Sequence, residues 1–166
     1  GIAAVACGVP ATFPVFETPN ATVVSGMLTP NGQPRTAPAA LEAELSADGL
    51  IIDWEELRDL HGSVRLPDDE ARLALHMLDR APWRVFITVF RGSDGIFHTH
   101  PAEPEAHLEL FRRIDARIGE MTARLDSDDT VMLVSDHGMT RLREFLHVNA
   151  FFWRSGLLGR RHIPTT

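Results

Sequence analysis

The chain has 166 residues, 44% of them hydrophobic, and a formal net charge of -7. This size and composition predict a globular domain with a substantial hydrophobic core. Its acidic residues are spread among arginines and leave no basic face, which argues against binding to a nucleic-acid polymer. The sequence has no apolar run long enough to span a membrane and no secretory signal, so it predicts a cytoplasmic protein without a membrane segment.

The first third of the sequence predicts a strand, a long loop and a helix. The apolar run 2–9 is the strand. Residues 10–38 are rich in Pro, Thr and Gly and lack periodicity, which predicts a long loop serving a site, with room for a short strand at 22–25. Good helix formers at 39–45 have acidic residues near their start and a glycine soon after their end. A short strand at 50–52 is expected to follow.

The rest of the sequence alternates helices with strands. A leucine-rich stripe predicts a helix over 67–80. The run 84–90 is β-branched, aromatic and apolar on both faces, which is typical of an inner strand. Apolar residues at three- and four-residue spacing predict a helix over 104–125, and a strand at 130–134 follows it. The last element is a helix over 149–155, ended by a glycine.

This order of elements predicts an α/β fold. A strand, a helix and a second strand in succession imply a parallel crossover, so we expect a mainly parallel sheet with helices on both faces. The chain opens without Met, directly on the first predicted strand. We therefore expect residues 1–166 to be a single α/β domain that is an internal fragment of a larger one, with the loop 10–38 on its substrate side.

Two pairs of polar residues follow predicted strands. Asp94 and His98 come after the first inner strand, and Asp136 and His137 come directly after the next. Ligands bind beyond the carboxyl ends of parallel strands, where these side chains are expected to lie. Carboxylate oxygen and imidazole nitrogen together suit zinc or manganese. The two pairs therefore predict a divalent-metal site.

Each of these motifs also has a simpler interpretation. Asp136, His137 and Gly138 could form a turn in which the carboxylate caps the backbone, and Asp94 with His98 could be an ordinary pair on the protein surface. The recurrence of an Asp/His pair after two predicted strands favours the metal site. His100 has three interpretations: a metal ligand, a substrate contact or a loop residue before a proline.

The Asp/His pairs stand within two longer segments, FRGSDGIFH at 90–98 and VSDHGM at 134–139. In this order they resemble the type I phosphodiesterase/nucleotide pyrophosphatase family of the alkaline phosphatase superfamily. The similarity extends over most of the chain, through the segments 9–14, 24–30, 148–152 and 156–158.

The resemblance implies a hydrolase that cleaves phosphodiester or pyrophosphate bonds of a small phosphoester substrate. It implies two divalent metal ions, with zinc as the preferred metal and manganese as the alternative. Asp94 and His98 match ligands of one ion, and Asp136 and His137 match ligands of the other. The family uses a Thr or Ser nucleophile in an in-line displacement, which leaves a phospho-enzyme that water hydrolyses.

The sequence departs from the family pattern at the nucleophile. The family carries its nucleophile and another Asp ligand after an N-terminal strand and a further His ligand near the C-terminus, and none of the three has a clear counterpart here. Thr12 is the candidate nucleophile within the chain, although its neighbours match a later family loop. We therefore expect the nucleophile outside these residues. The alternative is a non-catalytic metal-binding or interaction domain derived from the same fold.

Overall fold

The computed structural model describes residues 1–51, 59–80, 82–140 and 142–159. The chain divides into two compact units, residues 1–132 and residues 133–166. Among the described residues the first unit contains the sheet and helices α1 to α4, and the second contains helix α5. Each unit is described by itself.

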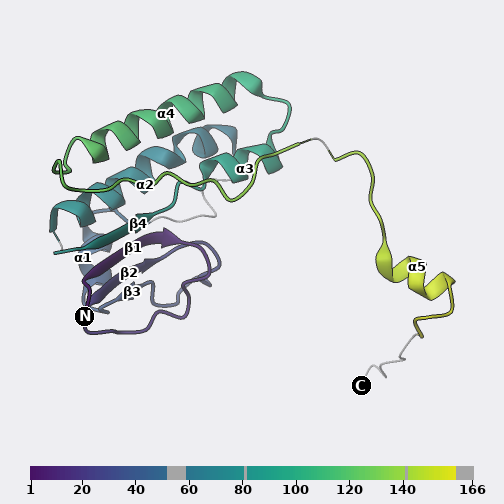
Figure 1. The fold of residues 1–166 in the computed structure, drawn as a ribbon, viewed down its shortest axis with the longest axis horizontal. Coiled ribbons are helices and arrows are strands. Elements are labelled where there is room, and N and C mark those ends of the chain that lie inside the picture. Colours follow the sequence, from purple (N-terminus) through teal and green to yellow (C-terminus); the bar gives the residue numbers. More distant parts are fainter. Residues whose placement is uncertain (52–58, 81, 141, 160–166) are drawn as a thin grey trace. The chain divides into compact units, whose positions relative to one another are not determined.

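A sheet of four strands, counted over the described ranges, organises the first unit (Figure 1). Its order is β3-β2-β1-β4. The central strand β1 (Ala4–Val9) pairs in parallel with β2 (Ala21–Ser25) and with β4 (Val85–Thr88). The two-residue β3 (Thr36–Ala37) pairs antiparallel with β2. The predicted α/β class with a mainly parallel sheet is confirmed, and so is the short strand predicted at 22–25.

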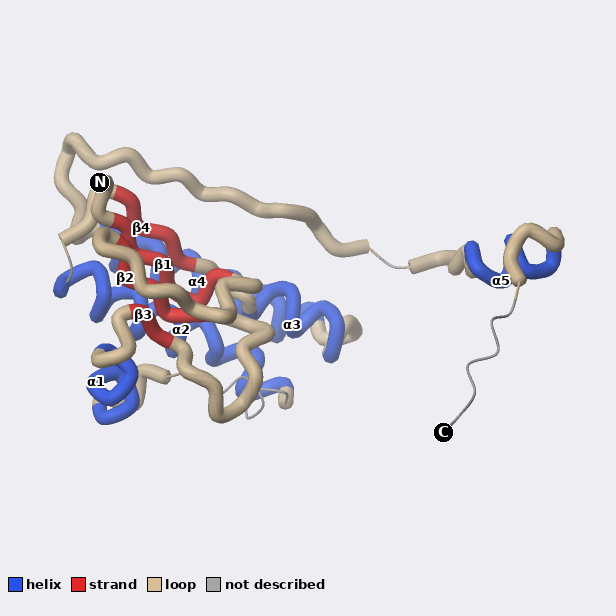
Figure 2. Tube along the Cα trace, turned by 90° about the horizontal axis from the view of Figure 1, so that it is seen from below, coloured by secondary structure: helices blue, strands red, loops and turns tan. Residues whose placement is uncertain are grey.

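The helices of the first unit are α1 (Leu41–Ala47), α2 (Leu60–Arg80), α3 (Gly92–Thr99) and α4 (Pro104–Thr122). Figures 1 and 2 show α2 and α4 on one side of the sheet and α3 beyond the ends of the strands. Helices α2 and α4 were predicted from their apolar spacing and α1 from its helix formers and end signals, and α2 begins earlier than expected, with Pro67 inside it. Helix α3 was not predicted, because two glycines within eight residues lower its helix propensity.

The hydrophobic core lies between the sheet and helices α1 and α2. Side chains at alternate positions of a strand point to the same face, and Val5 and Cys7 of β1 both point into this core. Burial raises the pKa of the Cys7 thiol to about 12, so the thiol stays protonated and packs as a small apolar group. The other buried members of the core come from β2, α1, α2 and the chain after α1: Val24, Leu45, Leu50, Leu73 and Met77.

The strand predicted at 50–52 does not form at residues 50 and 51, and residue 52 lies outside the described ranges. The backbone N–H of Leu50 donates to the carbonyl of Leu45 at 2.8 Å, and Gly49 has a φ of 63°. These features close the C-terminus of α1, so the N–H that a strand would need is already used by the helix end.

The prediction that 84–90 is an inner strand covered on both faces was wrong. Strand β4 lies at the end of the sheet, and Val85 and Ile87 are 43% and 49% exposed. The neighbour expected from 130–134 forms no ladder within the part of the chain described, and Val131 and Met132 are exposed. An apolar run can indicate an extended segment, but a strand needs backbone partners that the run itself does not specify.

Helix α5 (Val148–Arg154) of the second unit confirms the helix predicted at 149–155 and its glycine stop. Gly156 adopts a φ of 70°, and its N–H donates to the Trp153 carbonyl at 3.1 Å. The N–H of Leu157 donates to the Phe152 carbonyl at 2.9 Å. This pair of hydrogen bonds is the Schellman ending, which requires the left-handed backbone that glycine adopts without a steric cost.

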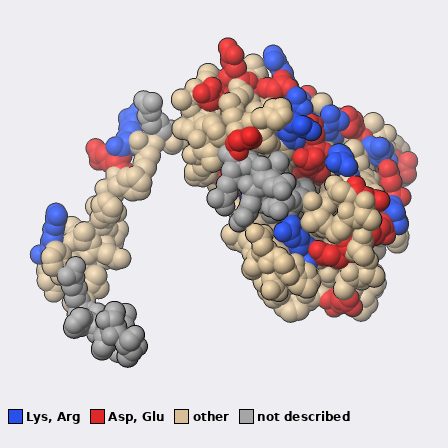
Figure 3. Space-filling model, turned by 180° about the vertical axis from the view of Figure 1, so that it is seen from behind, with Lys and Arg blue, Asp and Glu red and all other residues tan. Residues whose placement is uncertain are grey.

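Charges of both signs are interspersed on the face of the molecule in Figure 3. Within the described ranges, no helix combines the length and the apolar character needed to cross a bilayer.

Charged side chains join helices α2 and α4. Asp68 accepts hydrogen bonds from Arg113 Nη1 at 2.6 Å and from Arg117 Nε at 2.9 Å. One carboxylate therefore links α2 to two successive turns of α4.

Asp68→Asn is expected to lower the free energy of unfolding by about 1 kcal/mol, because two arginines lose a partly buried anionic partner. Urea unfolding at low and at molar salt measures the effect, which should shrink as salt screens the charges. Asp115→Asn on the exposed face of α4 is the control and should have little effect. Equal losses in both variants would contradict a specific role for Asp68.

Candidate metal-binding site

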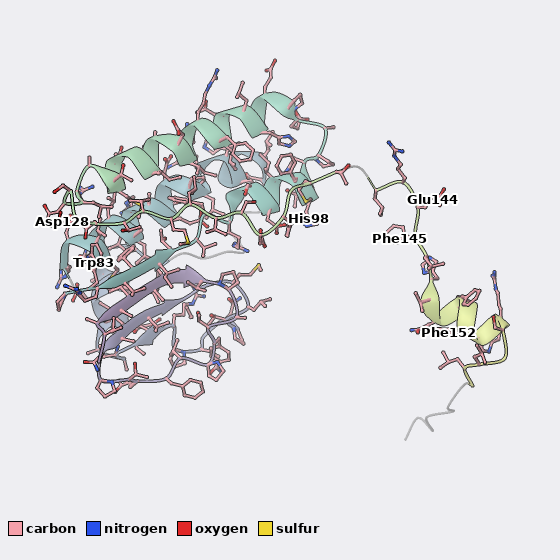
Figure 4. All side chains as sticks on the ribbon, viewed as in Figure 1. Trp83, His98, Asp128, Glu144, Phe145 and Phe152 are labelled. Carbon is pink, nitrogen blue, oxygen red and sulfur yellow. The ribbon has the colours of Figure 1, made fainter. Side chains whose placement is uncertain are left out.

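The first Asp/His pair lies on helix α3, which begins shortly after β4 ends. Asp94 and His98 are one helical turn apart, and Asp94 Oδ1 lies 3.3 Å from His98 Nε2. The side chains are 43% and 65% exposed, and Figure 4 labels His98 on this helix. The structure therefore brings this predicted pair together on a solvent-facing surface beyond the carboxyl end of a parallel strand.

A buried glutamate supports the start of α3. Glu70 of α2 is 4% exposed, and its carboxyl oxygens lie 3.0 and 3.2 Å from the backbone N of Arg91. Desolvation raises the pKa of Glu70 to about 8, and hydrogen bonds from the backbone of Arg91 and Gly92 oppose this rise. Burial also lowers the pKa of the Arg91 guanidinium, while the charges of Glu70 and Asp94 act in the other direction.

The second Asp/His pair lies in the second unit, in a turn. Asp136 Oδ2 is 3.4 Å from His137 Nε2, and the His137 N–H donates to Asp136 Oδ1 at 2.9 Å. The Ser135 hydroxyl donates to the His137 carbonyl at 2.8 Å, so Ser135 closes the turn. Both side chains of the pair are more than half exposed. The turn presents one carboxylate oxygen and one imidazole nitrogen side by side.

The spacing within each pair fits a zinc ion. Two ligand atoms at about 2.0–2.1 Å from a tetrahedral ion lie roughly 3.3 Å from each other. The measured separations are 3.3 Å in the Asp94–His98 pair and 3.4 Å in the Asp136–His137 pair. A carboxylate and a protonated imidazole can make an ion pair at the same distance. The two pairs belong to different compact units, so their convergence on one site stays a prediction.

Thr12 lies in the turn after β1, and its hydroxyl is already hydrogen-bonded. Thr12 Oγ1 donates to the Val9 carbonyl at 2.7 Å and accepts from the Gly26 N–H at 3.4 Å. A Cβ on Gly26 would lie 2.2 Å from the Gly8 carbonyl oxygen, so only glycine fits where β1 and β2 end. Since β1 and β4 are parallel neighbours, Thr12 and helix α3 both come after the carboxyl ends of these strands, at the same end of the sheet.

His100 follows the last residue of α3. Its Nδ1 lies 2.8 Å from the Thr99 hydroxyl, and its carbonyl accepts a hydrogen bond from His107 Nε2 at 2.8 Å. The His107 ring also packs on Phe97, with ring centroids 4.4 Å apart. His100 therefore helps join the end of α3 to α4, and its role as a substrate contact stays a prediction.

A third group of metal-ligand residue types was not predicted from the sequence. Glu44, Asp48 and His76 offer one ligand atom each, all within 4.8 Å of one another, and could hold a metal ion. Glu44 lies in α1, Asp48 is the C-cap residue of α1 and His76 lies on α2, so no sequence motif signals the group. Glu44 Oε1 already contacts Arg80 Nη1 at 2.8 Å and His76 Nε2 at 3.2 Å. A metal ion would have to compete with the Arg80 guanidinium for that oxygen.

Comparison with known proteins adds one finding. A family model described as type I phosphodiesterase / nucleotide pyrophosphatase matches residues 3–164, nearly the whole chain. No curated protein and no solved structure matches the chain. The match includes both Asp/His pairs, so the resemblance read from the two motifs is confirmed at the level of the family.

Proposed function

The chain belongs to the type I phosphodiesterase / nucleotide pyrophosphatase family, and we propose that it is a metal-dependent member acting on a small phosphoester. The family implies hydrolysis of phosphodiester or pyrophosphate bonds. The single observation that supports metal dependence is that two Asp/His pairs each hold an oxygen and a nitrogen at the spacing of zinc ligands.

In this proposal Asp94 and His98 hold one divalent ion, and Asp136 and His137 hold the second. Zinc fits the mixed oxygen and nitrogen ligands best, and manganese is the second choice. Two bound ions would supply positive charge that neutralises phosphate oxygens during an in-line displacement. The protein's own task is to keep each carboxylate beside its imidazole and to leave both pairs open to a substrate, which their exposure allows.

We further propose that the displacement uses a Thr or Ser hydroxyl, with Thr12 as the candidate in this chain and His100 as a candidate substrate contact. The loop 10–38 would then border the substrate, because Thr12 belongs to it and lies at the same end of the sheet as α3. To attack a phosphorus atom, the Thr12 hydroxyl must break its hydrogen bond to the Val9 carbonyl. Thr12→Ser keeps a hydroxyl and Thr12→Ala removes it, so the two variants separate chemistry from turn structure.

Asp136→Ala is expected to weaken zinc binding at one site by about 100-fold or more, because it removes an anionic ligand from an exposed turn. Titration calorimetry on the full chain should give two zinc ions for the wild type, with the second-unit site lost in the variant. Asp94→Asn should remove the other site. Since both side chains are well exposed, circular dichroism should remain close to that of the wild type.

Two control variants make this test specific. Asp128→Ala removes an exposed carboxylate that belongs to neither pair and should leave zinc binding unchanged. His76→Ala removes a member of the Glu44, Asp48 and His76 group and should also leave the two sites intact. Unchanged zinc binding in Asp136→Ala and Asp94→Asn, or loss in His76→Ala alone, would overturn the assignment.

The alternative function is a non-catalytic metal-binding or interaction domain derived from this fold. The observation in its favour is that the hydroxyls of Thr12 and Ser135 both donate to carbonyls of turns. Hydrolysis of bis(4-nitrophenyl) phosphate by the zinc-loaded chain separates the two functions. Turnover that is lost in Asp94→Asn supports the enzyme, whereas two bound zinc ions without turnover, in the natural full-length protein as well as in this chain, support the alternative.

A further inference from the structure

We propose that Glu70 is a positioning residue for the Asp94–His98 pair, because its buried carboxyl group holds the first turn of α3 against α2. This inference rests on the proposed function of the pair and adds a residue that no sequence motif indicates. Glu70 lies on a different helix from the pair and, within the described contacts, reaches neither Asp94 nor His98.

The contact replaces a local helix cap. The first N–H groups of a helix have no partner within it and usually bond to a side chain at the N-cap. In α3 the N-cap residue, Arg91, provides no such side-chain bond. Its own N–H instead donates to the carboxyl group of Glu70, which lies 21 residues earlier in the sequence. The backbone of Gly92 also acts on this carboxyl group and lowers its pKa.

The packing around this contact leaves little freedom. A Cβ on Gly92 would lie 3.1 Å from Leu110 Cδ1 of α4 and 3.3 Å from Pro67 Cδ of α2. One turn further along α3, Ile96 is completely buried. Gly92 and Ile96 therefore form the inner face of the helix, and Asp94 and His98 lie on its exposed part. The rotation of α3 about its axis decides how far Asp94 and His98 reach into solvent.

Burying the carboxyl group of Glu70 costs desolvation free energy, which argues that the group is there to position α3. An apolar residue at position 70 would avoid the desolvation of a carboxyl group but leave the backbone N–H of Arg91 without this acceptor. The charged groups that act on Glu70 are Arg91 at the start of α3 and its neighbour Asp69 on α2. In the described hydrogen bonds, Glu70 is the side chain that accepts from the Arg91 N–H, and Asp69 does not take part.

The test measures backbone protection and zinc affinity in the full chain. Glu70→Ala is expected to speed amide hydrogen exchange across residues 91–99 by about tenfold or more, because the first turn of α3 loses its acceptor. Zinc affinity at the Asp94–His98 pair should fall by about tenfold, as for loss of a supporting contact, while the Asp136–His137 pair keeps its affinity. Glu70→Gln retains an acceptor oxygen and should restore most of both properties.

Asp69→Ala is the matched control, because it removes a carboxylate from the neighbouring position of the same helix and should change neither readout. If Glu70→Ala fails to fold, Gly92→Ala tests the same contact region, since its Cβ would crowd Leu110 Cδ1 and Pro67 Cδ at the start of α3. Wild-type exchange in 91–99 together with wild-type zinc affinity, in either variant, would overturn the inference.

Failure of the inference and failure of the proposed function give different results. If His98→Ala leaves zinc binding unchanged, the proposed metal site is wrong. Loss of protection across 91–99 in Glu70→Ala would even then support Glu70 as the residue that positions Asp94 and His98. If His98→Ala abolishes one zinc site but Glu70→Ala changes neither exchange nor affinity, the proposed function stands and the role of Glu70 is refuted.

Discussion

Ile96→Ala is expected to lower the free energy of unfolding by about 2 to 5 kcal/mol, one of the two largest effects predicted for this protein. Ile96 lies midway between Asp94 and His98 and is 0% exposed. Removing three carbons from a buried side chain loses their transfer free energy and leaves a cavity that the neighbouring helices fill only in part. Urea unfolding followed by circular dichroism measures the loss.

Leu108→Ala is the control for this substitution, because Leu108 lies on α4 and is 52% exposed. It should change the stability by less than about 1 kcal/mol. Ile96→Val removes one carbon and should fall between the two, at about 0.5 to 1.5 kcal/mol. Equal losses in Ile96→Ala and Leu108→Ala would show that α3 is not packed as described.

Glu70→Gln is expected to remove a dependence of stability on pH. Burial raises the pKa of Glu70 from 4.5 to about 8 in the folded chain. Between these values the folded state keeps a proton that the unfolded state has released, so stability falls as pH rises, by up to about 1.4 kcal/mol per pH unit. The total loss of stability is a few kcal/mol. It is complete above about pH 8, and there is no loss below about pH 4.5.

Unfolding by urea at several values between pH 5 and pH 9 measures this dependence. Other groups add their own slopes, so the quantity that matters is the difference between wild type and Glu70→Gln. That difference should shift in favour of the glutamine variant as pH rises and should level off above pH 8. Glu105→Gln changes an exposed carboxylate and should follow the wild type. A constant difference across the range would contradict a buried, proton-holding Glu70.

Local pattern in the sequence was enough to predict several elements. Helix α4 repeats its apolar residues at three- and four-residue spacing, and the Schellman ending of α5 needs only Gly156 and its near neighbours. The contact within each Asp/His pair is also local, although helix α3, which makes that contact for Asp94 and His98, was not predicted. Residues one turn apart on a helix, or adjacent in a turn, meet whatever the rest of the chain does.

The sequence by itself therefore determined the α/β class, most helices, the two motifs and the family that they indicate. Only the tertiary structure decided that β4 ends the sheet and that Glu70 of α2 holds the start of α3. It also brought Glu44 of α1 beside His76 and Arg80 of α2. These contacts join residues that lie far apart in the chain, and they depend on how whole helices and strands pack. Local propensity and periodicity describe each element alone and contain no information about that packing.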